Sequence, residues 1–392
     1  MTATADTIQD TPLTKNFEIR PYQQRIMTKA TDSFQGRFCN AAGQLQKFSR
    51  SVLIESPTGS GKTVMGWSVA KKLQEEIPDL HVAWYAMRRN LLKQAERENK
   101  ALGFNVRNVM FMSMFDTNLQ PLIDVTEQGK KLLLVFDEAQ HDSSPTMASN
   151  HNHIKPDFVL GLTATPFRTD RLKLCFDHVI RDAGIHQLIM DGYLSKYHHY
   201  TIKKFDVETV FETYIREPKR WGKSIFYFKD LTQCAHLHRL LIEHGVTSEF
   251  VTGDSDVETQ LKLFSDGRVT CLVNCMKLTE GFDEPTLQTA WVRDSCRGPT
   301  MQMAGRVFRK HPSVQFKQVV QSEESEHPMV KTALPSQSFA WDESLRIWKT
   351  MKVNEKIDEI TEMMLIEVVQ NMVPMPEYIT NKKKKKKSSF KA

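Results

Sequence analysis

Continuous apolar runs alternate with helical patterns twice along this chain of 392 residues, and that repeated alternation limits the folds it can adopt. In the first half, apolar runs occupy 51–55, 81–86, 109–112, 131–136 and 158–162. Such unbroken runs are typical of parallel strands buried on both faces of a sheet. Between the first two runs, residues 61–77 place apolar side chains at helical spacing, and Pro78 ends the pattern. The first half therefore predicts a doubly wound α/β domain.

The same alternation restarts in the second half of the chain. A helical pattern at 231–244 ends at Gly245, and strand-like runs occupy 223–228, 248–252, 270–275, 289–293 and 314–320. Gly184 and Gly192 interrupt both patterns, which places the boundary between the two domains near 183–200. We therefore expect a flexible N-terminus (1–16), two doubly wound parallel-sheet domains (17–190 and 191–325), a helical segment (326–380) and a lysine-rich tail (381–392).

The C-terminal segment has its own apolar pattern. Within 341–373, large apolar side chains recur as one stripe at Leu345, Trp348, Met351, Ile357, Ile360, Met364 and Val368. This spacing predicts a helix that packs on the second domain and is closed by Pro374 and Pro376. The run of lysines that follows is expected to be disordered.

Charge and composition exclude several classes of protein. The formal net charge is +6, but residues 381–392 contain seven lysines and no acid, which leaves about −1 for the rest of the chain. A polyanion would therefore be bound by a local groove rather than by a basic surface. The longest apolar run, 132–136, is far shorter than the ~18 residues of a membrane-spanning helix, and the first residues lack the apolar core of a signal peptide. Six cysteines without CxxC spacing predict neither a metal site nor a disulfide framework.

The strongest local motif is the segment 56–63, Ser-Pro-Thr-Gly-Ser-Gly-Lys-Thr, which follows an expected strand and begins an expected helix. Its glycines allow backbone N–H groups to curl around phosphate oxygens at a helix N-terminus. Its lysine would reach the β- and γ-phosphates, and its threonine hydroxyl would bind Mg²⁺. A serine stands where the general pattern has its first glycine. The candidate nucleotide contacts here are Thr58, Gly59, Ser60, Gly61, Lys62 and Thr63.

Two adjacent carboxylates supply the second half of a nucleotide-hydrolysis site. Asp137 and Glu138 directly follow the apolar run 132–136, at the carboxyl end of an expected buried strand. Carboxylates at this position lie beside the phosphate loop in doubly wound folds. Asp137 would hold Mg²⁺ through water, and Glu138 would polarise the attacking water.

Two arginines of the second half complete the expected site. The segment 302–309, Gln-Met-Ala-Gly-Arg-Val-Phe-Arg, is expected to begin a helix of the second domain. Arg306 and Arg309 are three residues apart, so one helical turn would point both in the same direction. Two guanidinium groups on one face would suit the γ-phosphate of a nucleotide bound by the other domain, as arginine fingers do.

In this order, the motifs resemble those of superfamily 2 helicases, the DEAD/DEAH-box class of nucleic-acid motors, from about 17 to 320. The resemblance implies two tandem RecA-like domains, with ATP and Mg²⁺ in the cleft between them and nucleic acid across their top. It assigns adenine recognition to Gln23 of the Arg-Pro-Tyr-Gln motif, counts Arg20 of that motif among the nucleotide-binding residues, and places Asp283 near the ribose. It also assigns Gln302 to the catalytic motif at 302–309. The residues that would couple hydrolysis to domain movement are Gln140, Thr163 and Thr165.

The resemblance also implies where nucleic acid would be bound, mainly through its phosphate backbone. In the first domain the matching residues are Arg89 and Gln94. In the second domain they are Thr252, Gly253, Lys277 and Thr279. The lysine tail would add salt-sensitive attraction or serve as a nuclear address, or it has no required role.

Some letters depart from the named subgroups and favour the DNA-directed branch. Gln140 is the fourth letter of the acidic box, Met303 follows Gln302, and the third motif is Thr-Ala-Thr instead of Ser-Ala-Thr. The whole set is closer to recombination, repair, restriction and phage-encoded motors than to RNA helicases. We therefore expect an ATP-dependent DNA helicase or translocase in the cytoplasm of a bacterial or phage-infected cell, or in the nucleus of a eukaryote.

Three other functions stay open. One is an RNA helicase, and another is a translocase that moves on duplex DNA without unwinding it. The third is a nucleic-acid-binding scaffold with a vestigial ATPase, against which the intact phosphate loop, acidic pair and arginines argue.

Overall fold

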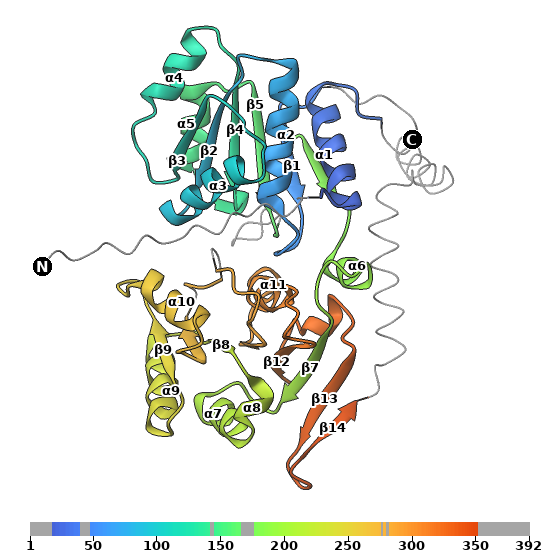
Figure 1. The fold of residues 1–392 in the computed structure, drawn as a ribbon, viewed down its shortest axis with the longest axis vertical. Helices are drawn as coiled ribbons and strands as arrows, with labels where there is room; N and C mark the ends of the chain where they lie inside the picture. Colours follow the sequence, from blue (N-terminus) through green and yellow to red (C-terminus); the bar gives the residue numbers. More distant parts are fainter. Residues whose placement is uncertain are drawn as a thin grey trace, which may run out of the picture.

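The computed structural model describes residues 18–39, 48–141, 145–165, 176–275, 277–279 and 282–351. Within these ranges the chain forms two sheets, one above the other in Figure 1. The N-terminus (1–16), the part of the expected helical segment at 352–380 and the lysine tail lie outside the described residues. The mixed α/β class with mainly parallel sheets is confirmed.

The first sheet has the strand order β3-β2-β4-β5-β1-β6, and all its pairings are parallel. The bounds are β1 (Ser51–Glu55), β2 (His81–Ala86), β3 (Val109–Ser113), β4 (Leu132–Asp137), β5 (Phe158–Thr163) and β6 (His178–Arg181). Three of these strands are buried along nearly their whole length, β2, β4 and β5, which explains their unbroken apolar sequences.

Helices cover both faces of the first sheet (Figure 1). They are α1 (Pro21–Phe34), α2 (Lys62–Glu76), α3 (Arg89–Ala101), α4 (Gln120–Glu127) and α5 (Pro145–Ile154). On one face, the indoles of Trp67 in α2 and Trp84 in β2 stack with their centroids 4.0 Å apart. On the other face, Leu122 of α4 packs with Tyr85 and Phe136. None of the helices that the structure describes has the length and apolar character needed to span a bilayer.

The second sheet has the order β14-β13-β7-β12-β11-β8-β10-β9 and is parallel except for β14. Its strands are β7 (Tyr197–Ile202), β8 (Ser224–Tyr227), β9 (Ser248–Val251), β10 (Cys271–Asn274), β11 (Thr289–Val292), β12 (Lys317–Ser322), β13 (Gln337–Asp342) and β14 (Ile347–Met351). Its helices are α7 (Val207–Arg216), α8 (Pro218–Trp221), α9 (Leu231–Glu243), α10 (Val257–Ser265) and α11 (Arg297–Gly305). Helix α6 (Ile185–Met190) lies between β6 and β7, so the chain passes from one sheet to the other in the segment where we expected the boundary.

The expected helix at 341–373 is wrong over its described part, which forms the antiparallel hairpin β13–β14. Its Trp341 and Trp348 face each other across the two strands, with ring centroids 5.2 Å apart. Leu345, which we placed on the buried stripe, is 59% exposed at the hairpin turn. The helical spacing of the large side chains was misleading because β13 pairs with β7 and adds a hairpin to the sheet.

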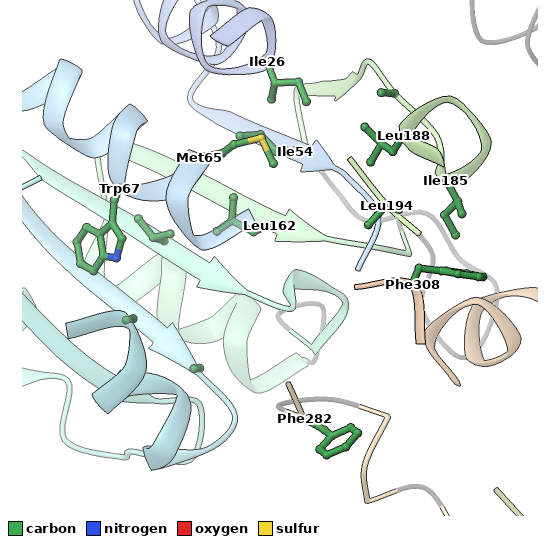
Figure 2. Close-up of a cluster of buried hydrophobic side chains, with 14 of the residues drawn as sticks. Ile26, Ile54, Met65, Trp67, Leu162, Ile185, Leu188, Leu194, Phe282 and Phe308 are labelled. Carbon is green, nitrogen blue, oxygen red and sulfur yellow. The ribbon is translucent and has the colours of Figure 1, made fainter. Parts of the chain in front are cut away.

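One apolar cluster runs from the first domain into the second. It includes Leu188 of α6 and Leu194, in the segment that connects α6 to β7, together with Phe308 of the second domain. Figure 2 shows Leu194 and Phe308 close together where this connecting segment passes between the domains. The backbone N–H of Ser195 donates a hydrogen bond of 2.7 Å to the carbonyl of Phe308. The connecting segment therefore belongs to the packing of both domains.

Replacing Gly161 with alanine is expected to destabilise the first domain. A methyl group there would lie 2.6 Å from Phe176, 2.7 Å from Leu53 and 2.9 Å from the Cβ of Ala139. Overpacking of this kind costs about 1–3 kcal/mol, so the melting temperature should fall by several degrees. The matched control is Gly184→Ala, where an added methyl group meets open space. Equal melting temperatures for both variants, measured by circular dichroism, would contradict the packing described here.

Candidate active site

The phosphate-binding loop connects β1 to α2, as the motif predicts. Gly59 and Gly61 adopt left-handed backbone conformations, with φ of 81° and 80°. The positive φ of Gly61 favours glycine there, and a Cβ would also displace the amide of Gln23, whose Nε2 would lie 2.6 Å away. Ser56, which replaces the first glycine of the general motif, donates a hydrogen bond of 2.7 Å to the hydroxyl of Ser60. The hydroxyl of this serine is therefore taken up by a hydrogen bond within the loop.

The N-terminus of α1 braces this loop from one side. The hydroxyl of Tyr22 and Nε2 of Gln23 both donate hydrogen bonds to the carbonyl of Ser60, at 2.6 and 2.9 Å. Oε1 of Gln23 accepts from the backbone N–H of Arg20 at 3.0 Å. The structure thus places Gln23, expected to recognise adenine, with its amide bonded inside the protein at both ends. The role of Tyr22 was not predicted, although it stands inside the motif that we singled out.

The acidic pair lies at the end of β4, facing the lysine of the loop. Nζ of Lys62 is 4.0 Å from Oε1 of Glu138, and both side chains are largely buried. Glu138 has a left-handed backbone conformation, with φ of 60°, which is uncommon for a residue with a side chain. Burial, and then the negative charge of Glu138, raise the pKa of Asp137 to about 7. The structure therefore confines two acids next to one lysine.

A divalent cation fits the chemistry of this corner. Thr63 lies in the first turn of α2 and Asp137 at the end of β4, and they offer the hydroxyl and carboxylate oxygens that Mg²⁺ prefers. The raised pKa of Asp137 reflects a buried negative charge that a bound cation would offset. Thr63 and Asp137 would therefore hold the ion.

A hydrogen-bonded path leads from the acidic pair towards the second domain. Nε2 of Gln140 lies 3.2 Å from Oε2 of Glu138, and its Oε1 lies 2.7 Å from the hydroxyl of Thr163. The backbone N–H of Thr165 donates to that hydroxyl at 2.9 Å. Thr165 in turn has Cγ2 3.5 Å from the position of a Cβ on Gly298, at the start of α11. The structure thus brings together all three residues that we expected to couple hydrolysis to movement.

Helix α11 approaches the phosphate loop from the second domain. A Cβ on Gly305, at its end, would lie 3.1 Å from Cβ of Thr58, so the two backbones meet closely. Gln302 is buried in the second half of the same helix. We expected the segment 302–309 to begin a helix. In the structure it lies at the end of α11 instead. The motif therefore faces the loop from a helix C-terminus.

Arg309 faces the phosphate loop. Its Cγ is 3.4 Å from the position of a Cβ on Gly59. Its guanidinium forms an ion pair with the carboxylate of Asp283, the residue expected near the ribose. Burial lowers the pKa of Arg309 to about 10, so the group still carries its positive charge at neutral pH. The second domain thus presents one cation to the loop of the first.

Arg306 is bonded within its own domain, to the segment 279–283 that also contains Asp283, the ion-pair partner of Arg309. Its Nε donates to the carbonyl of Thr279 and its Nη1 to the carbonyl of Phe282, each at 2.9 Å, and the residue is only 6% exposed. The helix ends before Arg309, whose backbone is extended with φ −66° and ψ 134°. Arg306 anchors the Thr279 segment within the second domain.

The expected nucleic-acid contacts lie at the carboxyl ends of strands in both sheets. Arg89 is exposed at the start of α3, and Gln94 of the same helix donates to Glu98 at 2.8 Å. Thr252 and Gly253 form the turn after β9. Lys277 and Thr279 follow β10, where the carbonyl of Lys277 accepts a hydrogen bond of 2.6 Å from Nη2 of Arg88. The sequence analysis did not identify Arg88. Its hydrogen bond connects the expected nucleic-acid-binding residues of the two domains.

Comparison with known proteins agrees with these motifs. The family model of the Type III restriction enzyme, res subunit, matches residues 16–168. A protein of Saccharomyces cerevisiae that bears the name ATP-dependent helicase IRC3 is 21% identical over 354 residues, which cover 75% of this chain and 50% of that protein. A 51.5 kDa protein of a Lactococcus phage is 23% identical over 261 residues, covering 59% of this chain and 56% of that protein. The chain thus spans about half the length of these relatives.

A solved structure shows the same fold. It is the ATP-dependent Type ISP restriction-modification enzyme LlaBIII bound to DNA, which aligns with a TM-score of 0.53 and 14% identity. The alignment covers 78% of this chain and 28% of that enzyme. At this identity the likeness concerns the fold, and the site described above comes from the residues of this chain.

Proposed function

We propose that this chain, which resembles superfamily 2 helicases in its motifs, its tandem parallel sheets and its relatives, is a DNA-stimulated ATPase that moves along or remodels DNA. Membership of this class implies the use of ATP. The choice of DNA and the coupling to movement are the parts that we add.

The observation that carries the proposal is the approach of Arg309 to the phosphate loop. A cation from one domain stands against the loop of the other, next to Gly59. The charge of a γ-phosphate held by the loop would therefore be fully neutralised only when the two domains are together. This arrangement makes hydrolysis depend on domain closure, as a motor requires.

Each residue of the site would have a separate role in ATP hydrolysis. Lys62 would bind the β- and γ-phosphates, and Glu138, 4.0 Å from its ammonium, would take a proton from the attacking water. Arg309 would stabilise the negative charge of the transferred phosphoryl group. When bound, Mg²⁺ would neutralise phosphate charge beside Thr63 and Asp137. The path through Gln140 and Thr163 would transmit the loss of the γ-phosphate to Thr165 and α11.

Three features favour DNA over RNA. The third motif is Thr-Ala-Thr, the matched family model is that of a restriction enzyme subunit, and the similar fold of LlaBIII was determined on DNA. The near-neutral folded part of the chain suits a motor that binds a few phosphates through N–H groups and hydroxyls.

The test is the ATPase rate of the full chain with single-stranded DNA, duplex DNA, forked DNA and RNA of matched length, at two salt concentrations. DNA should raise the rate more than RNA, and added salt should reduce the stimulation because phosphate contacts release counterions. Lys62→Ala, which removes the phosphate-binding ammonium, is the control without turnover. Stimulation by RNA alone, or a DNA response that survives in Lys62→Ala, would overturn the proposal.

Strand separation and movement on duplex DNA are measured separately. A helicase should displace a strand from a forked substrate, whereas a duplex translocase should displace only the third strand of a triplex. Running both assays on the same preparation distinguishes these two forms of the proposed activity.

A further inference from the structure

Arg88 makes a contact between the two domains that none of the motifs assigns. Its backbone is extended at the N-cap position of α3, and its carbonyl accepts hydrogen bonds from the N–H groups of Leu91 and Leu92. Its Nη2 donates a hydrogen bond of 2.6 Å to the carbonyl of Lys277, which lies 189 residues further along the chain. Figure 1 shows α3 on the side of the first domain that faces the second. The contact therefore joins the start of α3 to the segment that follows β10.

The segment 277–279, which receives this bond, is fixed within the second domain. The N–H of Leu278 donates a hydrogen bond of 3.1 Å to Oδ1 of the buried Asn274. The hydroxyl of the buried Tyr227 donates to the carbonyl of Leu278 at 3.2 Å, and Nε of Arg306 donates to the carbonyl of Thr279 at 2.9 Å. Three successive carbonyls of this segment thus accept hydrogen bonds, the first from the other domain and the next two from within.

These bonds connect Arg88 to the arginine at the phosphate loop. Arg306 holds the segment 277–279, and three residues later Arg309 lies against that loop. Arg309 also pairs with Asp283, a few residues after the same segment. A shift of the segment relative to the first domain would therefore move Arg309 relative to the loop.

We propose that Arg88 is a positioning residue for Arg309. Its bond to the carbonyl of Lys277 docks the second domain so that Arg309 reaches the phosphate loop, and the inference rests on the proposed ATPase function. The acceptor is a backbone carbonyl, so Arg88 acts here on protein, whereas the exposed Arg89 and the ammonium of Lys277 are the expected contacts with nucleic acid. A hydrogen bond from a charged donor is stronger than one between neutral groups, so its loss should change how often the domains dock correctly.

Arg88→Met keeps an unbranched side chain and removes its N–H donors. It should lower kcat for ATP hydrolysis roughly 10- to 100-fold, with or without DNA, which is the range for one lost hydrogen bond to a charged group. ATP affinity should change little, because the loop and Lys62 remain intact. The slope of DNA affinity against salt should also be kept, since no phosphate contact is removed. Single-turnover hydrolysis, calorimetry with ATP and fluorescence anisotropy with labelled DNA measure these quantities on the full chain.

Two variants are matched to this one. Lys277→Ala removes the ammonium group and keeps the backbone carbonyl, so it should reduce the salt slope by about one, an effect that Arg88→Met should lack. Arg97→Met removes an exposed cation from the same helix, α3, and should hydrolyse ATP at the rate of the unaltered chain.

A double-substitution cycle separates positioning from a general structural effect. In a chain that carries Arg309→Ala, adding Arg88→Met should change the remaining rate little, because the group that Arg88 positions is already absent. A general loss of structure would instead reduce the rate by the same factor in both backgrounds.

The outcomes that contradict the inference are distinct. If the two losses of rate multiply, or if Arg88→Met leaves kcat unchanged, Arg88 does not position Arg309. If Arg88→Met reduces the salt slope by about one and leaves the rate at saturating DNA unchanged, Arg88 binds a phosphate and the inference is also wrong. An unaltered chain without DNA-stimulated ATPase activity would instead refute the proposed function, so the two failures remain separate.

Discussion

Arg309→Ala is expected to lower kcat for ATP hydrolysis about 10³-fold or more. The side chain lies against the phosphate loop at Gly59 and remains protonated at neutral pH, with a pKa of about 10. A cation in this position acts on the transition state, and removing an arginine finger costs about 10³–10⁵ in rate. ATP affinity should change far less than the rate. Single-turnover hydrolysis, with ATP binding measured in parallel, checks both.

Two further arginines make this test specific. Arg239 of α9 has a side chain that is 67% exposed, so Arg239→Ala should hydrolyse ATP at the normal rate. Arg306→Ala should instead lower the melting temperature, because the buried carbonyls of Thr279 and Phe282 lose their donors at about 1–3 kcal/mol each. If Arg309→Ala retains more than a tenth of the activity, the second domain does not complete the site as we describe.

Glu138→Gln should slow hydrolysis about 10²–10⁴-fold and leave ATP bound, since general bases contribute a factor of that size. Glutamine fills the same space, and its amide oxygen can still accept the hydrogen bond from Gln140. The change removes only the negative charge next to Lys62. Quenched-flow hydrolysis and equilibrium ATP binding measure the two effects separately.

The control for this substitution is Glu96→Gln, at a side chain on α3 that is 47% exposed and pairs with Lys100. It should behave like the unaltered chain in both assays. A variant Glu138→Gln that hydrolyses ATP at more than a tenth of the normal rate would assign the base to another group. Loss of ATP binding in that variant would instead show that Glu138 shapes the loop.

Features that depend on neighbouring residues in the chain could be predicted from sequence. The phosphate loop is one, because a strand, two glycines and a helix start follow one another within 51–76. The acidic pair is another, since Asp137 ends a strand whose apolar run is unmistakable. The coupling role of Gln140 and Thr163 came from the resemblance to superfamily 2 helicases, and the structure adds the contact between them.

Features that depend on distant packing could not be predicted in this way. Trp348 carries a helical spacing in the sequence, but it packs on Tyr200 of β7 and donates to Glu217, which no local pattern reveals. The segment 302–309 ends a helix instead of beginning one, because α11 stops at Gly305 and a 3-10 turn follows at Arg306–Phe308, which a spacing argument does not reveal. Leu194 and Ser195 meet residues more than a hundred positions away.

The burial of Leu194 between the two lobes, which are the two domains, makes their association depend on temperature. Leu194 and Phe308 belong to one apolar cluster that both lobes share, so parting the lobes would bring that cluster into contact with water. The free energy gained by burying such side chains weakens on cooling. At low temperature the apolar contact would therefore stabilise the packed domains less. The bound nucleotide would then have to supply a larger share of the free energy that holds the two domains together.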